Sequence, residues 1–187
     1  MVKAIFGGVG ALLVLVFAAT FWPLVSVPQG HAGVVSLFGD IQTTTLLPGL
    51  HVINPLANVI DVDVRQYPMT VGGHAGTKDL QSVDAAIVVN YRAVPESAGT
   101  LVSSFGANWH EIIIQPAVQD RMKGVTSLFT AEELITKRSE VSSQIKQAVL
   151  QAVRERSKGM VVVDDVTVSN FGFAKSFQTA IEEKQVS

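Results

Sequence analysis

The chain of 187 residues contains no cysteine, which excludes disulfide scaffolds, thiolate zinc sites and iron–sulfur clusters. Charge is scarce as well: 14 Lys and Arg stand against 16 Asp and Glu, a formal net charge of −2. A chain without a basic excess is poorly suited to a phosphate backbone, so we predict no nucleic-acid partner. With 48% hydrophobic residues the chain is too apolar to be disordered, and its length excludes a large multidomain enzyme.

One long stretch near the N-terminus lacks charge altogether. Residues 1–27 contain a single ionisable side chain, Lys3, and residues 4–25 contain none. At about 1.5 Å per helical residue this stretch can cross a hydrocarbon core of about 30 Å, which predicts a transmembrane signal anchor over residues 1–27. The side chains predicted to lie in the membrane are Ile5, Phe6, Leu12, Leu13, Leu15, Phe17, Phe21 and Trp22. The alternative is a cleaved signal peptide, which would make the chain an exported hydrolase or binding module.

Basic residues predict the orientation of the span. Lys3 precedes it, and the next basic residue is Arg65. By the positive-inside rule the N-terminus faces the cytoplasm and the bulk of the chain lies on the opposite side, which in a bacterium is the periplasm. The sequence therefore predicts a single-pass membrane protein whose first partner is the lipid bilayer.

The segment after the span has the pattern of β-structure. Between Pro28 and Gln66, β-branched runs are broken at Gly39-Asp40 and Pro48-Gly49, which predicts hairpins. Alternating apolar residues over 60–65 and 83–91 predict two strands, each with one buried face. Residues 72–76 are predicted to be a mobile loop, because a phosphate-binding loop would need Lys followed by Ser or Thr.

Helical periodicity begins beyond Pro95, with a predicted helix start at Asn108. A capping box with Thr130 as N-cap and Glu133 at N3 predicts the start of an amphipathic helix of about 28 residues. Residues 160–173 predict a strand or strand pair, and Ser176 begins another helical pattern. Strands, helices, a strand and a helix in this order predict an α+β fold.

Residues that could carry chemistry are present but isolated. Ser143 and Lys146 have the spacing of a serine acyl-transfer site without its companion motifs. The pairs Asp61/Asp63 and Asp164/Asp165 have the pattern of solvated carboxylates. The histidines are separated in sequence and lack metal-ligand spacing: His31, His51, His74 and His110. We therefore predict no enzyme, with no catalytic, cofactor-binding or metal-binding residues.

A leucine-rich turn lies close to the predicted membrane. Leu46, Leu47 and Leu50 surround Pro48-Gly49. Two interpretations remain open for them: a position in the core or in a subunit interface, and shallow insertion into the outer leaflet.

Three stretches of the sequence resemble the SPFH or band 7 superfamily, which includes prohibitin, stomatin and flotillin. They are the opening VPQGHAGVVSLFGDIQTTTLLPGLHVINPLANVIDVDVRQ, the helix FTAEELITKRSEVSSQIKQAVLQAV and the closing VDDVTVSNFGFAKSFQTAIEEKQVS. They occur in the family's order and cover essentially the whole chain. The likeness is nearest to prohibitin and to the bacterial subunits that modulate a membrane AAA protease.

The resemblance implies a membrane anchor followed by two SPFH subdomains: a mostly β subdomain over 28–94 and an α+β subdomain over 95–187. It also implies a scaffold that forms a large ring or cage with itself or a paralogous subunit, organises a membrane patch and regulates a membrane AAA protease. The resemblance further implies that the second subdomain leads into a C-terminal coiled-coil helix, as it usually does in family members. Because this sequence stops at Ser187, two alternatives remain open: an unusually short member of the family, or part of a longer chain.

Overall fold

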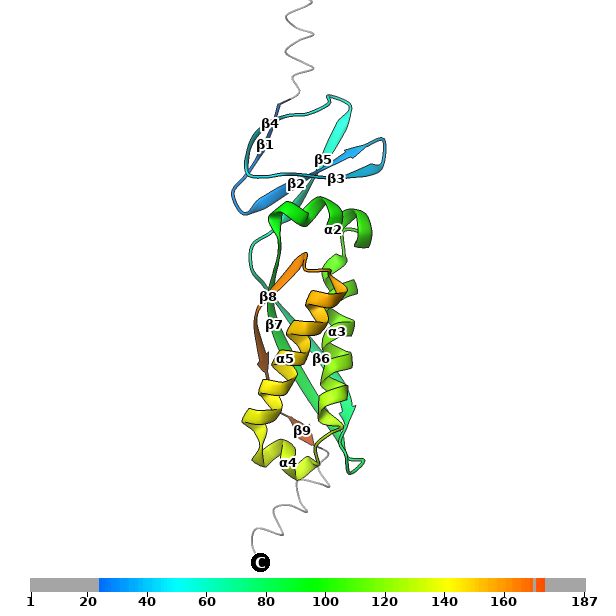
Figure 1. Ribbon diagram of the computed structural model, residues 1–187, viewed down its shortest axis with the longest axis vertical. Coiled ribbons are helices and arrows are strands. Elements are labelled where there is room, and N and C mark those ends of the chain that lie inside the picture. The colour runs from blue at the N-terminus through cyan, green and yellow to red at the C-terminus, as the bar shows by residue number, and fades with distance from the viewer. Residues whose placement is uncertain (1–23, 170, 174–187) are drawn as a thin grey trace, which may run out of the picture.

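The computed structural model describes residues 24–169 and 171–173, and Figure 1 shows an elongated molecule. The fold is α+β, as the sequence predicts. The predicted membrane-spanning side chains, from Ile5 to Trp22, and the helical pattern from Ser176 lie outside these residues. Among the residues that are described, no helix has both the length and the apolarity needed to cross a bilayer.

The N-terminal β unit is built from two small antiparallel sheets. One pairs β1 (Leu24–Val27) with β4 (Gly49–Val52), and the other has β2 (His31–Leu37) between β3 (Asp40–Leu46) and β5 (Ala57–Asp63). The β2–β3 hairpin turns through Phe38 and Gly39, which have φ values of 51° and 89°. Positive φ at both positions is the mark of a type I′ turn, whose twist matches that of the flanking strands.

Two predictions about this unit are wrong in detail. Residues 24–27, which the sequence analysis grouped with the anchor, form β1, because their backbone pairs with β4 in register Leu24 to Val52. The turn at Pro48-Gly49 does not close a β3–β4 hairpin either, since β4 turns away from β3 to make this pairing.

A third sheet, which we call the long sheet, runs along the rest of the long axis, in the order β6-β7-β8, with β9 also paired to β7. The strands are β6 (Tyr67–Gly76), β7 (Ser82–Ala93), β8 (Val161–Val168) and β9 (Gly172–Phe173). The prediction of a mobile loop over 72–76 is wrong, because these residues pair continuously with β7. Glycine suits the strand at Gly73, where an added Cβ would lie 3.0 Å from Met122 Cε of the helix packed above it.

Helices cover one face of this sheet (Figure 1). The helices that pack on it are α3 (Trp109–Thr126), against β6, and α5 (Arg138–Arg156), against β8, with the short α4 (Ala131–Thr136) preceding α5. The 3₁₀ turn η1 (Pro95–Ser97) and α2 (Ala98–Phe105) pack instead on β2 and β3 of the N-terminal β unit. The capping box and the helical periodicity predict one continuous helix after Thr130. That expectation is wrong at Lys137, where φ −107° and ψ 28° leave the helical range and divide α4 from α5.

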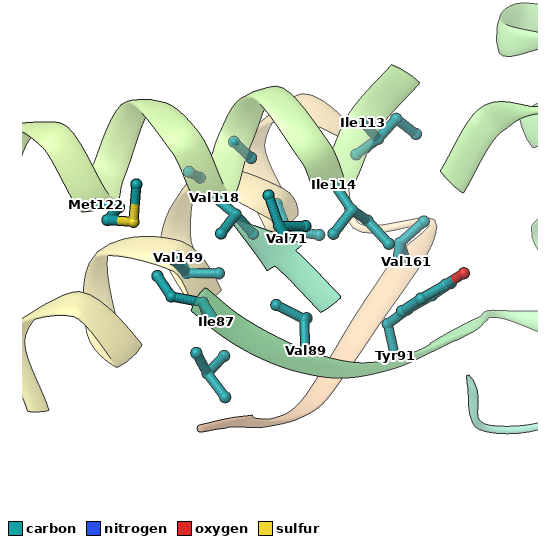
Figure 2. Packing of buried hydrophobic residues seen from close by; sticks show 14 of the residues in the cluster. Val71, Ile87, Val89, Tyr91, Ile113, Ile114, Val118, Met122, Val149 and Val161 are labelled. Atoms are coloured by element: carbon teal, nitrogen blue, oxygen red, sulfur yellow. The ribbon is translucent and has the colours of Figure 1, made fainter. Parts of the chain in front are cut away.

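Inward-facing side chains of the sheet and the helices form the core. The predicted buried face of β7, including Val83, Ile87 and Val89, is fully buried. Figure 2 shows Ile87 and Val89 on the side of β7 that faces Ile114 and Val118 of α3. The same cluster of buried residues extends into the N-terminal β unit through Ala32, Val34 and Val62, so one continuous core joins the two parts.

The division between the sheets falls near residue 66. β5 belongs to the N-terminal β unit, whereas β6 and β7 form one sheet with β8, which comes much later in the sequence. Sheet pairing therefore groups residues 67–93 with the helical part of the chain, whereas the family resemblance implies a boundary after residue 94.

Candidate functional site

Large apolar side chains are exposed at the end of the molecule where the chain leads back toward residues 1–23 (Figure 1). We call this set the apolar end surface: Leu24, Leu47, Leu50, Val52 and Leu56. Leu24 lies opposite Val52 in the β1–β4 pair, and Leu50 precedes Val52 by two residues. Because strand side chains alternate between faces, Leu24, Leu50 and Val52 share one face of this pair.

The exposure of these residues is high for aliphatic side chains. Val52 is 75% exposed, Leu50 69% and Leu56 58%, while Leu47 and Leu24 are near 40% at 41% and 37%. Complete burial of one such side chain contributes about 1.5–3 kcal/mol, so burial of the five exposed portions would contribute roughly 5 kcal/mol. That is similar to one short acyl chain, which holds a protein on a bilayer only marginally and needs a second anchor.

Charge does not contribute to this surface. From Leu24 to Val64 the chain contains no Lys or Arg, and its acidic residues are Asp40, Asp61 and Asp63. Attraction to anionic lipid headgroups needs clustered basic residues. The end surface can therefore contact a bilayer only through apolar burial.

The predicted leucines lie in different environments. Leu50 and Leu47 belong to the apolar end surface, but Leu46 is half-buried and packs toward Gly33 of β2, where an added Cβ would lie 3.2 Å from Leu46 Cβ. Sequence reasoning missed Leu24 and Val52 because it placed Leu24 in the membrane span. The sequence pattern that could have found them is the alternation of Leu50 and Val52, which is typical of a strand and therefore requires a partner strand.

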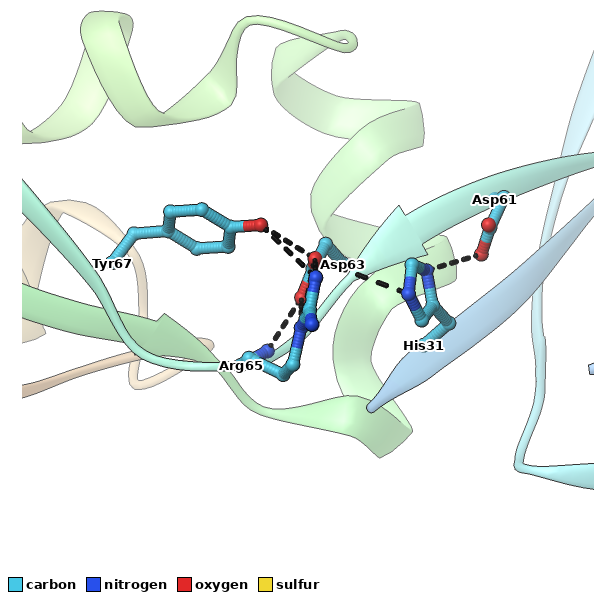
Figure 3. Close-up of polar contacts among 5 residues, drawn as sticks. All are labelled: His31, Asp61, Asp63, Arg65 and Tyr67. Atoms are coloured by element: carbon cyan, nitrogen blue, oxygen red, sulfur yellow. Dashed lines mark hydrogen bonds and ion pairs between the residues drawn. The ribbon is translucent and has the colours of Figure 1, made fainter. Parts of the chain in front are cut away.

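A polar cluster joins the N-terminal β unit to the long sheet, and we call it the polar joint (Figure 3). Asp63, at the end of β5, accepts hydrogen bonds from Arg65 Nε at 3.0 Å and from the hydroxyl of Tyr67 at 2.6 Å. The second guanidinium nitrogen of Arg65 also donates to Asp63. His31 Nδ1 lies 3.0 Å from Asp61 Oδ1, and its Nε2 lies 4.0 Å from Asp63 Oδ2.

Backbone contacts strengthen the polar joint. The N–H of Val64 donates to the carbonyl of Gly30 at 3.0 Å. Gly30 has a φ of 80°, and an added Cβ would lie 2.9 Å from Arg65 Cγ and Cδ, so the arginine stem lies across this turn. The joint thus connects the β1–β2 turn to the segment between β5 and β6.

The electrostatics of the joint favour its charged form. The hydrogen bonds from Arg65 hold the pKa of the Asp63 carboxyl well below its usual range; burial opposes this shift, and the hydroxyl of Tyr67 lowers the pKa further by a smaller amount. The same bond with Asp63 raises the pKa of the Arg65 guanidinium. Because Asp63 already has its donors, its carboxylate acts as a structural acceptor.

A cleft of about 320 Å³ opens beside the polar joint. Tyr91 and Trp109 form an edge-to-face pair on its wall, with ring centroids 5.8 Å apart. Other lining residues are Ile60, Asp61, Asp63, Arg65, Tyr67, Arg92, Val102 and His110. The acidic residues of this wall that face the cleft are already bound to His31, Arg65 or Tyr67, which leaves little unpaired polarity for a ligand.

The isolated candidates for chemistry stay separate in the structure. Lys146 Nζ donates to Asp165 at 2.6 Å, and Ser143 is exposed on α5. Arg92 Nε donates to Asp164 at 3.4 Å. Across the ranges that the structure describes, no cluster of three or more His, Asp or Glu side chains could hold a metal ion. Three histidines have separate neighbours: His31 contacts Asp61, His51 the carbonyl of Leu47, and His74 Asp84.

Comparison with known proteins identifies the family. The model of the SPFH domain / Band 7 family matches residues 25–187, so the chain belongs to this family, and the predicted resemblance is confirmed. Prohibitin-2 of Saccharomyces cerevisiae is 33% identical over 189 residues, which cover 99% of this chain and 60% of that protein. Prohibitin-2 of Schizosaccharomyces pombe is 30% identical over 99% of this chain and 65% of its own length.

Prohibitin 1 of Drosophila melanogaster is 30% identical over 166 residues, which cover 88% of this chain and 59% of that protein. The chain therefore spans about three fifths of the length of the curated relatives it matches. The α+β arrangement described above is thus that of an SPFH-type fold.

Proposed function

We propose that this protein is a non-enzymatic scaffold, anchored in a membrane by one N-terminal span, whose copies assemble side by side. The observation that carries the proposal is the apolar end surface, which lies beside β1, where the chain continues back to the uncharged segment. Because β1 begins at Leu24, the span consists of residues 4–23. Twenty helical residues cover about 30 Å, which is still sufficient for a bilayer core.

The two membrane contacts complement each other. A burial energy of roughly 5 kcal/mol gives only marginal binding on its own. When the same molecule also has a span, this burial does not have to hold the protein on the bilayer by itself. It then fixes the N-terminal β unit against the outer leaflet. In this proposal Leu47 and Leu50 insert shallowly together with Leu24, Val52 and Leu56, while Leu46 stays packed on β2.

The proposal also includes how the copies assemble and which protein they act on. Copies of this chain, alone or with a paralogous subunit, form a ring or cage that organises a patch of membrane and regulates a membrane AAA protease. Family membership and the prohibitin relatives support this role. Lys3 before the span and Arg65 after it support an N-terminus in the cytoplasm and the bulk of the chain on the opposite side.

Single-cysteine labelling tests the membrane contact, since the chain has no cysteine of its own. The full chain carrying Leu50→Cys is labelled with an environment-sensitive dye and placed in lipid nanodiscs with a shallow quencher. We expect quenching at Leu50 that persists at high salt, because the contact is apolar. Ser143→Cys, on the exposed face of α5, is the matched control and should stay unquenched. Equal quenching at both sites, or none at Leu50, would refute the proposed contact.

The second candidate, an exported hydrolase or binding module, follows from the alternative that the apolar start is a cleaved signal peptide. The mass of the mature chain isolated from membranes separates the two. Retention of residues 4–23 supports the scaffold, and their loss removes the anchor. A particle of many subunits in mild detergent supports assembly, whereas a monomer would contradict it.

A further inference from the structure

The long sheet is covered on one face and open on the other. α3 and α5 lie on one face (Figure 1), and among the described residues no helix or strand covers the opposite face. Directly paired residues share a face, and on the open face Thr70 pairs with Val88 and Gly72 with Ala86. A sheet with one bare face commonly buries it against another layer.

The open face has the composition of an interface. Its centre is flat and weakly polar, because Thr70, Gly72, Ala86 and Val88 carry short side chains without charge. Its margins carry polar pairs: His74 bonded to Asp84 at one end and the ion pair of Arg92 with Asp164 at the other. An uncharged centre with a charged rim is the usual anatomy of a protein–protein contact.

The helical layer on the other side of the molecule has complementary charge. β6, β7 and β8 contain three Asp and one Arg, whereas α5 contains four basic and two acidic residues and α3 two of each. Asp165 and Lys146 are bonded to each other within one copy, so for a contact with another copy the strands keep a net charge of −1 and the α3–α5 layer a net charge of +1. α3 also exposes an aliphatic side chain, Ile112, which is 53% exposed. The remaining charges are opposite in sign, which favours the sheet face of one copy facing the helical layer of another.

We infer that the open face of the β6-β7-β8 sheet in one copy packs on the α3–α5 layer of a second copy. The inference rests on the proposed side-by-side assembly and names the surfaces that meet. Stacking sheet on helices keeps the long axes of the copies parallel, so every N-terminal β unit faces the same membrane. The contact uses two different surfaces, and such a heterologous contact repeats until a ring closes.

Other pairings of the same sheet satisfy these conditions less well. Two β6 edges paired antiparallel would point the long axes in opposite directions and place the two membrane-proximal ends apart. Two open faces packed on each other would bring acidic strands together and would end at a dimer. Packing of the sheet on the helices places unlike charges opposite each other, and it can continue beyond two copies.

Cross-linking between two singly substituted chains tests the inference. One full-length chain carries Ala86→Cys on the open face, and a differently tagged chain carries Gln147→Cys on the exposed side of α5. The two are co-expressed in membranes and treated with a bis-maleimide that spans about 10 Å, the distance between stacked layers. We expect a heterodimer band at least ten times stronger than the band from either variant alone.

The outcomes separate the inference from the proposed function. A large particle without the mixed cross-link overturns the contact and leaves assembly intact. A dimer from Ala86→Cys alone shows open faces packed together and also overturns it. A monomer in mild detergent without any cross-link overturns the assembly itself.

A substitution provides a second measurement. Thr70→Lys adds a long charged side chain to the flat centre at an exposed strand position, so the fold should keep its thermal midpoint while the particle dissociates into smaller species. Thr44→Lys makes the same change at an exposed position of β3 and is the matched control. Equal particle sizes for both variants would contradict the inferred contact.

Discussion

Gly99 permits a close contact between α2 and β3, and we predict that Gly99→Ala destabilises the fold. A Cβ at this position would lie 2.4 Å from the carbonyl oxygen of Thr43 and 3.0 Å from that of Gln42. Thr45 Oγ1 also accepts a hydrogen bond from the N–H of Gly99 at 2.9 Å and donates one to the carbonyl of Glu96 at 3.2 Å. The N-terminal β unit is therefore in direct backbone contact with the first turn of α2.

The magnitude follows from two opposing effects. Overpacking a close-packed site costs about 1–3 kcal/mol, and here the obstructing atoms are backbone and cannot rotate away. Ala in place of a helical Gly regains about 0.5–1 kcal/mol. Because immovable backbone places this site at the upper end of the overpacking range, about 3 kcal/mol, the net loss is about 2 kcal/mol. This lowers the thermal midpoint of a chain of this size by roughly 4–8 °C.

Thermal unfolding of the full chain in mild detergent, followed by circular dichroism, measures this effect. Gly124→Ala is the matched control, because Gly124 lies in α3 and an added Cβ would meet nothing within 4 Å. The control should raise the midpoint by roughly 1–4 °C through helix propensity alone. If Gly99→Ala also raised the midpoint, the close approach of α2 to β3 would not exist, and the reasoning would be refuted.

Two further predictions concern a helix cap and the polar joint. Thr130 Oγ1 accepts from the N–H of Glu133 at 3.2 Å, so Thr130→Ala should cost about 0.5–2 kcal/mol in thermal unfolding, whereas the exposed Ser143→Ala should change nothing measurable. Because the pKa of Asp63 is lowered, it stabilises the fold above its unfolded pKa near 4, and this contribution is lost as the pH falls through the lowered folded pKa. Acid unfolding should therefore depend less on pH in Asp63→Asn, with Tyr67→Phe intermediate; identical acid profiles would contradict this.

Local signals in the sequence were sufficient to predict elements whose structure depends on residues close together in the chain. The alternation from Val83 to Tyr91 marks a strand with one buried face, and that face is buried. Thr130 and Glu133 form the reciprocal hydrogen bonds of a capping box, at 3.2 and 3.1 Å. In both cases the pattern and the structure depend on residues a few positions apart.

Elements that depend on distant partners were missed. Residues 72–76 have loop composition, but pairing with β7 and the proximity of Met122 to Gly73 make them a strand. Leu24 is as apolar as the span before it, and only its pairing with Val52 places it in a sheet. The sequence predicted only Leu47 and Leu50 of the apolar end surface. Leu24 and Val52 come together through the β1–β4 pairing, which the sequence alone does not show.

The polar joint lies between two parts of the molecule, the N-terminal β unit and the long sheet, whose proposed contacts point in different directions. In the proposed function the apolar end surface contacts the membrane along the long axis, while the side-by-side assembly of copies acts across it. Both can form in every copy only if the angle between the N-terminal β unit and the long sheet is the same throughout. The contacts of Asp63 with Arg65 and Tyr67 on one side, and of Gly99 with β3 on the other, hold that angle from two separate places. Weakening either contact should therefore affect the size distribution of the particles before it removes the protein from the membrane.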